Sequence, residues 1–437
     1  MPEQNPPGET QSGEVRVALG SIYGTRDAPR AWYLHLKAAF AQHGLREIGI
    51  EKGLYCLPGK DGPAMLVSTH VDDLAVALRA ADANAAGILH QLSQELHLRE
   101  EVVPTTYCGK RVEVTPEAVY LSQPKAVSAL ELVQVQPARK QEADSPLQPQ
   151  EQTLYRSVVG QLEQTLYRSV VGQLLWLATQ TRPDLGFAVS RAAQWFAQAT
   201  VADLLQLNSL IKQAQQHSAA KLTFRRNLFG FSEDSAFANA QGLKSQYGVV
   251  VVVTTDPRSY IAGQYSVGMM WTWASATIKR VVRSTLAAEA YAISEAAEFG
   301  HLLRQLLQQV HHPELTLKQL EAAAPTGALL VVTDSQNLAT NVPKDTSAVT
   351  DKRLRIVITM LRETFLDPQQ RTQLLWKPTG LMLADGLTKA VKADALLAAT
   401  DSSVSATSAN LRNRYGFGAV SVSAPHRRAD IAVPVVR

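Results

Sequence analysis

The sequence predicts an α+β fold, with a hairpin-based part followed by a mixed sheet flanked by helices. Strand-like runs at 53–57 and 64–70 flank the Gly-rich turn GKDG, which is a hairpin pattern. Residues 167–219 have helical spacing with a break at Arg182-Pro183. After residue 221 the order is three strands, helix, strand, helix, strand and helix. That order is typical of a mixed sheet with helices packed on it.

Composition places the chain among globular proteins with several domains. It has 437 residues, 46% hydrophobic and 19% charged, enough for two to four domains with real cores. No apolar run approaches the roughly 18 residues of a membrane span, and residues 1–13 lack the apolar region of a secretory signal. Cys56 and Cys108 are the only cysteines, which excludes a disulfide scaffold and indicates a reducing compartment. The net charge of +4 permits a polyanionic partner without requiring one.

The first elements are expected to be a helix at 31–43, ending at Gly44, then the hairpin and a third strand at 74–78. The pair Asp72-Asp73 lies between the second and third strands. A tight turn there presents both carboxylates side by side for a divalent ion, and an exposed acidic turn without function is the alternative.

A twelve-residue repeat interrupts the middle of the chain. The sequence EQTLYRSVVGQL occupies 151–162 and recurs unchanged at 163–174. In a continuous helix the second copy would be rotated by roughly 120° relative to the first. Because the second copy continues directly into LWLATQ, we interpret the first copy as an insertion. The polar, Pro-containing residues 137–149 are interpreted as a linker.

Four acidic residues occupy positions where a solvent-exposed surface role is a poor explanation: Asp234, Glu289, Asp334 and Asp385. Asp234 is expected at the end of a first strand spanning 222–235, and Glu289 lies among alanines within a helix at 284–310. Asp334 follows the apolar strand 328–333, and Asp385 lies in LMLADGLTK. Taken singly, each could be a surface acid, or an N-cap in the case of Asp334.

Together the four carboxylates indicate two-metal phosphodiester hydrolysis. They come from different elements and could meet only by folding. Two Mg²⁺ or Mn²⁺ ions about 4 Å apart neutralise developing charge and activate water, and such ions prefer oxygen ligands. Bound metals would also explain how buried carboxylates are tolerated.

Four sequence blocks resemble the signature blocks of the ribonuclease H domain of copia-type retrotransposons: 231–234, 284–297, 333–338 and 376–389. The resemblance implies that Asp234, Glu289, Asp334 and Asp385 are the catalytic metal ligands. The sequence departs from the family at Ser335, where the family has Asn, and in the Glu block, which reads STLAAEAY.

The N-terminal half resembles the reverse transcriptase of the same elements. IYGTRDAPRAWY at 22–33 is similar to a family motif, and His70-Val71-Asp72-Asp73 is similar to the YVDD catalytic turn. A polymerase needs a third carboxylate upstream, but Asp27 is the only Asp before Asp61 and lies where the family is not acidic. We therefore expect a truncated module that does not synthesise DNA, with Asp72 and Asp73 as remnant metal ligands.

The expected domain organisation follows from these blocks. Residues 1–14 are a polar leader, 15–135 a truncated reverse-transcriptase palm and thumb-like region, and 136–223 a linker and helical connection. Residues 224–390 are a ribonuclease H-like domain, and 391–437, which lack a strong period, are a disordered tail.

Residues flanking the four carboxylates are candidates for contacts with phosphates or bases: Lys279, Arg280, Arg283, Ser335 and Gln336. Trp271 and Trp273 could stack on bases if exposed, and a strand with one buried face explains their alternation equally well. No GxGxxG or Walker loop occurs, so no nucleotide or other small-molecule cofactor is expected.

The function expected from the resemblance is Mg²⁺-dependent hydrolysis of the RNA strand of RNA–DNA hybrids by part of a Pol polyprotein. The partner is then nucleic acid, without a membrane, in the cytoplasm or nucleus. The alternative is a decayed, non-catalytic relic that at most binds nucleic acid.

Overall fold

The computed structural model describes residues 25–60, 62–79, 81–101, 103–148, 166–194, 199–225, 231–239, 245–254, 261, 268–279, 282, 284–325, 327–344, 349, 351–389, 393–400, 431–432 and 435–436. The chain divides into two compact units. Unit 1 comprises Met1–Cys108, Gln305–Ala323 and Ala424–Arg437, and unit 2 comprises Gly109–Arg304 and Ala324–Ser423. In the described ranges no helix has the length and hydropathy needed to cross a membrane.

Unit 1 contains an antiparallel sheet with strand order β1-β2-β3-β4-β16-β5, and β15 also pairs with β4. Its strands are β1 (Arg46–Glu47), β2 (Leu54–Gly59), β3 (Gly62–His70), β4 (Asp73–Arg79), β5 (Glu100–Glu101), β6 (Thr105–Tyr107, outside this sheet), β15 (Ile431–Ala432) and β16 (Val435–Val436). Its helices include α1 (Ala28–Gln42), α2 (Ala83–Glu95) and α11 (Leu317–Ala322). Alternating apolar residues of β3 and β4 share one buried cluster with Phe40 of α1 and Leu92 of α2. The predicted hairpin and third strand are confirmed.

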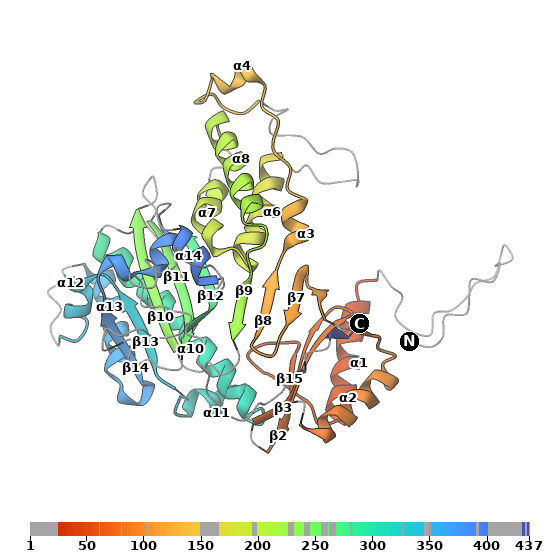
Figure 1. Ribbon diagram of the computed structural model, residues 1–437. Helices are drawn as coiled ribbons and strands as arrows, with labels where there is room; N and C mark the ends of the chain where they lie inside the picture. Colours follow the sequence, from red (N-terminus) through yellow and green to blue (C-terminus); the bar gives the residue numbers. More distant parts are fainter. Residues whose placement is uncertain are drawn as a thin grey trace. The chain divides into compact units, whose positions relative to one another are not determined.

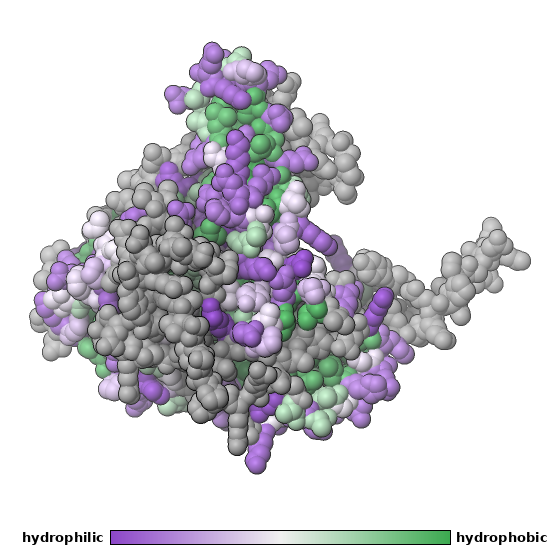
Figure 2. All heavy atoms as spheres, viewed as in Figure 1, coloured by the Kyte–Doolittle hydropathy of each residue, from purple (hydrophilic) through white to green (hydrophobic). Residues whose placement is uncertain are grey.

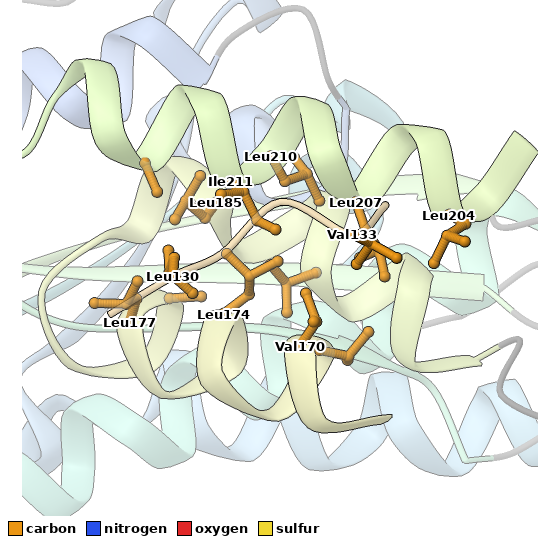
Figure 3. Packing of buried hydrophobic residues seen from close by; sticks show 14 of the residues in the cluster. Leu130, Val133, Val170, Leu174, Leu177, Leu185, Leu204, Leu207, Leu210 and Ile211 are labelled. Atoms are coloured by element: carbon orange, nitrogen blue, oxygen red, sulfur yellow. The ribbon is translucent and has the colours of Figure 1, made fainter. Parts of the chain in front are cut away.

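A helical block opens unit 2. It comprises α3 (Pro124–Ser128), α4 (Pro137–Lys140), α6 (Leu166–Gln180), η1 (Pro183–Leu185), α7 (Gly186–Gln194) and α8 (Val201–Gln216). Leu174 and Leu177 of α6 pack against Leu207 and Ile211 of α8 in one buried cluster (Figure 3). Figure 2 shows hydrophobic residues gathered over this block, beneath the more hydrophilic α4. The predicted helical region with its break at Pro183 is confirmed.

The second copy of the repeat supplies the start of α6, since residues 166–174 are helical. The first copy lies outside the described residues. Three antiparallel strands, β7 (Lys110–Val114), β8 (Ala118–Ser122) and β9 (Leu222–Arg225), accompany the helical block.

A five-stranded mixed sheet forms the rest of unit 2, with strand order β12-β11-β10-β13-β14 (Figure 1). The first three strands along the chain are antiparallel neighbours, and β13 and β14 run parallel to β10. The strands are β10 (Phe231–Asn239), β11 (Ser245–Thr254), β12 (Gly268–Thr277), β13 (Leu329–Thr333) and β14 (Thr372–Trp376). The helices are α10 (Thr285–His311), α12 (Gln336–Asn341), α13 (Lys352–Leu366), η2 (Pro368–Gln370), η3 (Thr379–Leu381), η4 (Leu383–Leu387) and α14 (Ala393–Thr400). The predicted α+β fold with a mixed sheet is confirmed.

Two expectations about these elements are wrong. The predicted strand 222–235 is two strands, because β9 pairs with β8 while β10 pairs with β11 and β13. The tail expected to be disordered contains α14, whose Leu396 is fully buried in a cluster with Met382 and Leu387. Further along, β15 and β16 pair with β4.

Candidate functional site

Asp334 is the first residue after β13, whose five residues are all buried. The indole Nε1 of Trp376 donates a hydrogen bond to the Asp334 main-chain oxygen at 3.1 Å, and the Thr379 hydroxyl donates to its Oδ2 at 2.8 Å. Ser335, not Asp334, caps the following helix by accepting a hydrogen bond from the Leu338 N–H. Asp334 is therefore held at the carboxyl end of the strand without serving as an N-cap.

Asp234 lies within β10, three residues after its start, and not at the end of a strand as expected. Its backbone pairs with Val250 of β11 and, in parallel, with Val332 of β13. Asp334 follows this partner of Asp234 by two residues, just beyond the end of β13. The structure describes the backbone of Asp234 but not its side chain.

Glu289 lies on α10 and is half-buried between the buried Ala288 and Ala290. Burial raises the pKa of its carboxyl group above the ordinary value, and the negative charge of Asp334 raises it further. A hydrogen bond with the Ser335 side chain acts in the opposite direction on this pKa. Two of the four predicted carboxylates, Glu289 and Asp334, thus lie close enough to interact electrostatically.

Asp385 lies in η4 and is 0% exposed. Its Oδ1 is 3.1 Å from the Lys389 ammonium, four residues along the chain. The turn η4 lies against β11, because a Cβ at Gly248 would come within 2.8 Å of the Ala384 carbonyl oxygen. Asp385 is therefore beside the strand that pairs with β10, and its carboxylate is partnered by an ammonium group.

These residues fit a hard divalent cation in the chemistry of their donors. Glu289 and Asp334 supply carboxylate oxygens, and a bound cation would compensate both the burial of Glu289 and its repulsion by Asp334, which together raise the Glu289 pKa. Among the side chains that the structure describes, no three His, Cys, Asp or Glu residues are grouped closely enough to hold a metal.

The residues predicted to touch nucleic acid differ in their surroundings. Lys279 and Gln336 are exposed, while Ser335 is only 8% exposed. Arg280 and Arg283 lie outside the described residues.

Trp271 and Trp273 on β12 are half-buried, and both contact other parts of the unit. The Trp273 indole N–H donates to the Ala178 oxygen at 2.7 Å, and Trp271 packs edge-to-face on Phe224. Contacts of both rings within the unit are compatible with a strand that buries one face, and stacking on bases stays a prediction.

Asp72 and Asp73 belong to the tight connection between β3 and β4, where His70 pairs with Asp73. Asp72 is exposed and Asp73 half-buried. Val71 has φ 53°, the left-handed region, and its main-chain oxygen accepts a hydrogen bond from the Trp32 indole N–H at 2.8 Å. A two-residue turn with a positive φ at its first position resembles the II′ hairpin type. Asp72 lies in this turn and Asp73 begins β4, and their role as metal ligands stays a prediction.

Sequence reasoning missed Trp376, Thr379 and Lys389 as partners of the carboxylates. The signal was present, since all three lie in the block 376–389, and Lys389 follows Asp385 at the i+4 spacing of facing side chains.

Comparisons with known proteins find a family match and two similar polyproteins. Residues 4–134 match the family described as reverse transcriptase (RNA-dependent DNA polymerase). The chain is 25% identical over 310 residues to the retrovirus-related Pol polyprotein from transposon RE1 of Arabidopsis thaliana, covering 66% of this chain and 19% of that polyprotein. It is 26% identical to the corresponding polyprotein from transposon RE2 of the same plant, covering 67% and 20%.

Two solved structures were also matched. One is an RNase H1 from compost, LC11-RNase H1, with 17% identity, 39% of this chain and 99% of that chain covered, and a TM-score of 0.25. The other is a foamy viral protease-reverse transcriptase in complex with RNA/DNA hybrid, with 12% identity, 34% and 17% coverage, and a TM-score of 0.21.

The chain combines a region that matches the reverse transcriptase family, residues 4–134, with a five-stranded mixed sheet. The chain is related to the Pol polyproteins of retrotransposons, and it spans about a fifth of the length of the curated relatives that it matches.

Proposed function

We propose that the chain is part of a copia-type Pol protein and that its mixed-sheet domain hydrolyses the RNA strand of RNA–DNA hybrids. The observation that carries this proposal is the proximity of Glu289 and Asp334: the negative charge of Asp334 adds to the larger effect of burial in raising the pKa of Glu289. The Asp234 backbone on the neighbouring strand supports it, as do the family relationships above. Such a set of carboxylates suits phosphodiester hydrolysis better than any chemistry that requires a nucleophilic side chain.

Asp234, Glu289, Asp334 and Asp385 would hold two Mg²⁺ or Mn²⁺ ions. Bound there, the metals supply charge neutralisation and water activation for phosphodiester cleavage. The protein's part is to fix the carboxylates: β13 and the Thr379 hydroxyl orient Asp334, and α10 presents Glu289. Contacts to 2′-hydroxyl groups would select the RNA strand.

The proposal assigns hydrolysis and not DNA synthesis to these 437 residues. Asp72 and Asp73 have the form of a polymerase turn. Two Asp residues precede them in the sequence, Asp27 and Asp61. In the family that this region resembles, polymerisation also needs an upstream Asp on a separate strand.

A second candidate function is a non-catalytic relic that at most binds nucleic acid. The Lys389–Asp385 ion pair favours it, because a buried carboxylate partnered by an ammonium group does not need a metal to compensate its charge.

The test uses the full chain with an RNA–DNA hybrid labelled on each strand in turn, in Mg²⁺. We expect cleavage of the RNA strand alone, no cleavage of duplex DNA, and loss of about a hundredfold or more in Asp334→Asn. Asp144→Asn is the matched control, since Asp144 is an exposed acid of the same unit. Cleavage that is equal in both variants would remove Asp334 from the site. Hybrid binding by wild type without any cleavage would favour the relic.

A further inference from the structure

A tryptophan ring lies exposed beside Asp334. Trp376 is the last residue of β14 and pairs with Thr333, the residue just before Asp334. Its side chain remains 41% exposed although it is among the largest apolar groups of the unit. The indole N–H is already used on the Asp334 main-chain oxygen at 3.1 Å, so the orientation of the ring is fixed while much of its surface stays open to solvent.

Core packing does not explain this placement. The buried cluster on this sheet takes Leu375 from β14, and Trp376 is not among its members. The following residues Pro378, Thr379 and Gly380 are exposed as well. The surface next to Asp334 is therefore a rigid ring bordered by small and polar groups.

The electrostatics of the site limit what can hold a polyanion there. Asp334 and Glu289 repel phosphates, and a lysine or arginine at the same place would compete with metal ions for the carboxylates. A neutral aromatic ring contacts nucleic acid through its face without joining that competition. Aromatic side chains commonly serve as platforms for nucleic acids in this way.

We infer that the Trp376 ring contacts the hybrid substrate, packing on a sugar of the strand whose phosphate is presented to Asp334. In a paired hybrid the bases are stacked on one another, whereas sugars line the wide, shallow minor groove and are open to contact. This inference rests on the proposed function, because it assigns Trp376 to the substrate of that same site.

The test separates the ring from its N–H group. Trp376→Phe keeps an aromatic face and removes the donor to the Asp334 oxygen, whereas Trp376→Ala removes both. The matched control is Trp176→Ala, because Trp176 on α6 is 43% exposed and belongs to the same unit. Binding of a labelled RNA–DNA hybrid to the full chain is measured by anisotropy in EDTA, where cleavage is blocked, and kcat and KM are measured in Mg²⁺.

We expect Trp376→Ala to raise Kd about tenfold and Trp376→Phe about threefold or less, with Trp176→Ala close to wild type. KM should rise with Kd while kcat changes little. Unchanged Kd in Trp376→Ala would overturn the inference. An equal loss of kcat in Ala and Phe with Kd unchanged would overturn it too, because Trp376 would then act only by positioning Asp334. Binding that depends on Trp376 in a wild-type chain that cleaves nothing would refute the proposed function while upholding the contact.

Discussion

The two acidic sites of the molecule are built in opposite ways. Asp72 and Asp73 are adjacent in sequence, at a two-residue turn between paired strands. Glu289 and Asp334 come from a helix and from the end of a strand, and they meet only because α10 packs near the carboxyl end of β13.

The difference shows in the chemistry of the carboxyl groups. Asp72 is exposed, whereas burial and a neighbouring charge raise the pKa of Glu289. A local acidic turn needs only the backbone geometry of a hairpin, and it can form without a function. A half-buried pair of like charges costs stability, so its presence is better evidence of a functional site.

The largest loss of hydrolysis is expected from Glu289→Gln. Glu289 would help to hold the metal ions that neutralise the transition-state charge, so removing its carboxylate should lower hydrolysis about a thousandfold. The measurement is single-turnover cleavage of a labelled hybrid. Glu295→Gln is the control, since Glu295 is an exposed acid on the same helix. Similar rates in the two variants would make the Glu289–Asp334 pair a structural feature.

The second prediction concerns a buried ion pair in the helical block of unit 2. Arg182 is buried and donates two hydrogen bonds, each 2.8 Å, to the carboxylate of Asp184. It also donates to the main-chain oxygens of Ala214 and His217 at the end of α8. Arg182→Leu leaves Asp184 buried and unpaired, and should lower the free energy of unfolding by about 3–5 kcal/mol.

Urea unfolding followed by hydrogen exchange measures this effect. Protection should fall in α8 and remain in β3 and β4, because the hairpin belongs to unit 1. The double variant Arg182→Leu with Asp184→Leu should recover part of the loss, since no unpaired charge remains. Equal loss of hydrogen-exchange protection in both units would contradict the prediction that the effect is confined to unit 2.

A smaller effect is expected from pH on the helix that carries Glu289. Burial, and then the charge of Arg304, lower the pKa of His301 from 6.5 to about 4. Between these values the unfolded chain binds a proton that the folded chain does not, so the free energy of unfolding falls as the pH falls from 6.5 towards 4. In His301→Gln, denaturant titrations should show a shallower decline over that window. A decline identical to wild type would mean that His301 is not the responsible group.

Much of this organisation could be predicted from the sequence. Periodicity located the hairpin, α10 and β13, because each buries one face or a whole apolar run. It failed at 222–235, since strand-like residues do not encode which sheet each half joins, and β9 and β10 have different partners. It also failed at α14, where two helical turns are too short for a periodic signal and burial of Leu396 supplies the stability.

The candidate site was predictable in residue type but not in surroundings. The four acids were visible as polar residues within apolar runs. Their partners depend on register and turns: Trp376 reaches Asp334 because β14 pairs with β13, and Thr379 does so from η3. Such contacts join neighbouring strands and follow from no pattern within either one.

The smallest change in the free energy of unfolding is expected at the hairpin turn. Val71 has φ 53° although it is β-branched, and its side chain is 66% exposed. A β-branched residue is strained in this region, whereas glycine adopts it freely. Val71→Gly should therefore raise the free energy of unfolding by about 0.5–1 kcal/mol, because little burial is lost and the strain is relieved. Val71→Ala, which keeps a Cβ, should gain less in the free energy of unfolding.

If urea unfolding shows that Val71→Gly destabilises the chain, the turn is not strained. The Trp32 hydrogen bond to Val71 then only accompanies a relaxed backbone. Hydrolysis should be the same in all three proteins, since the turn and the carboxylates of the mixed sheet belong to separate sites.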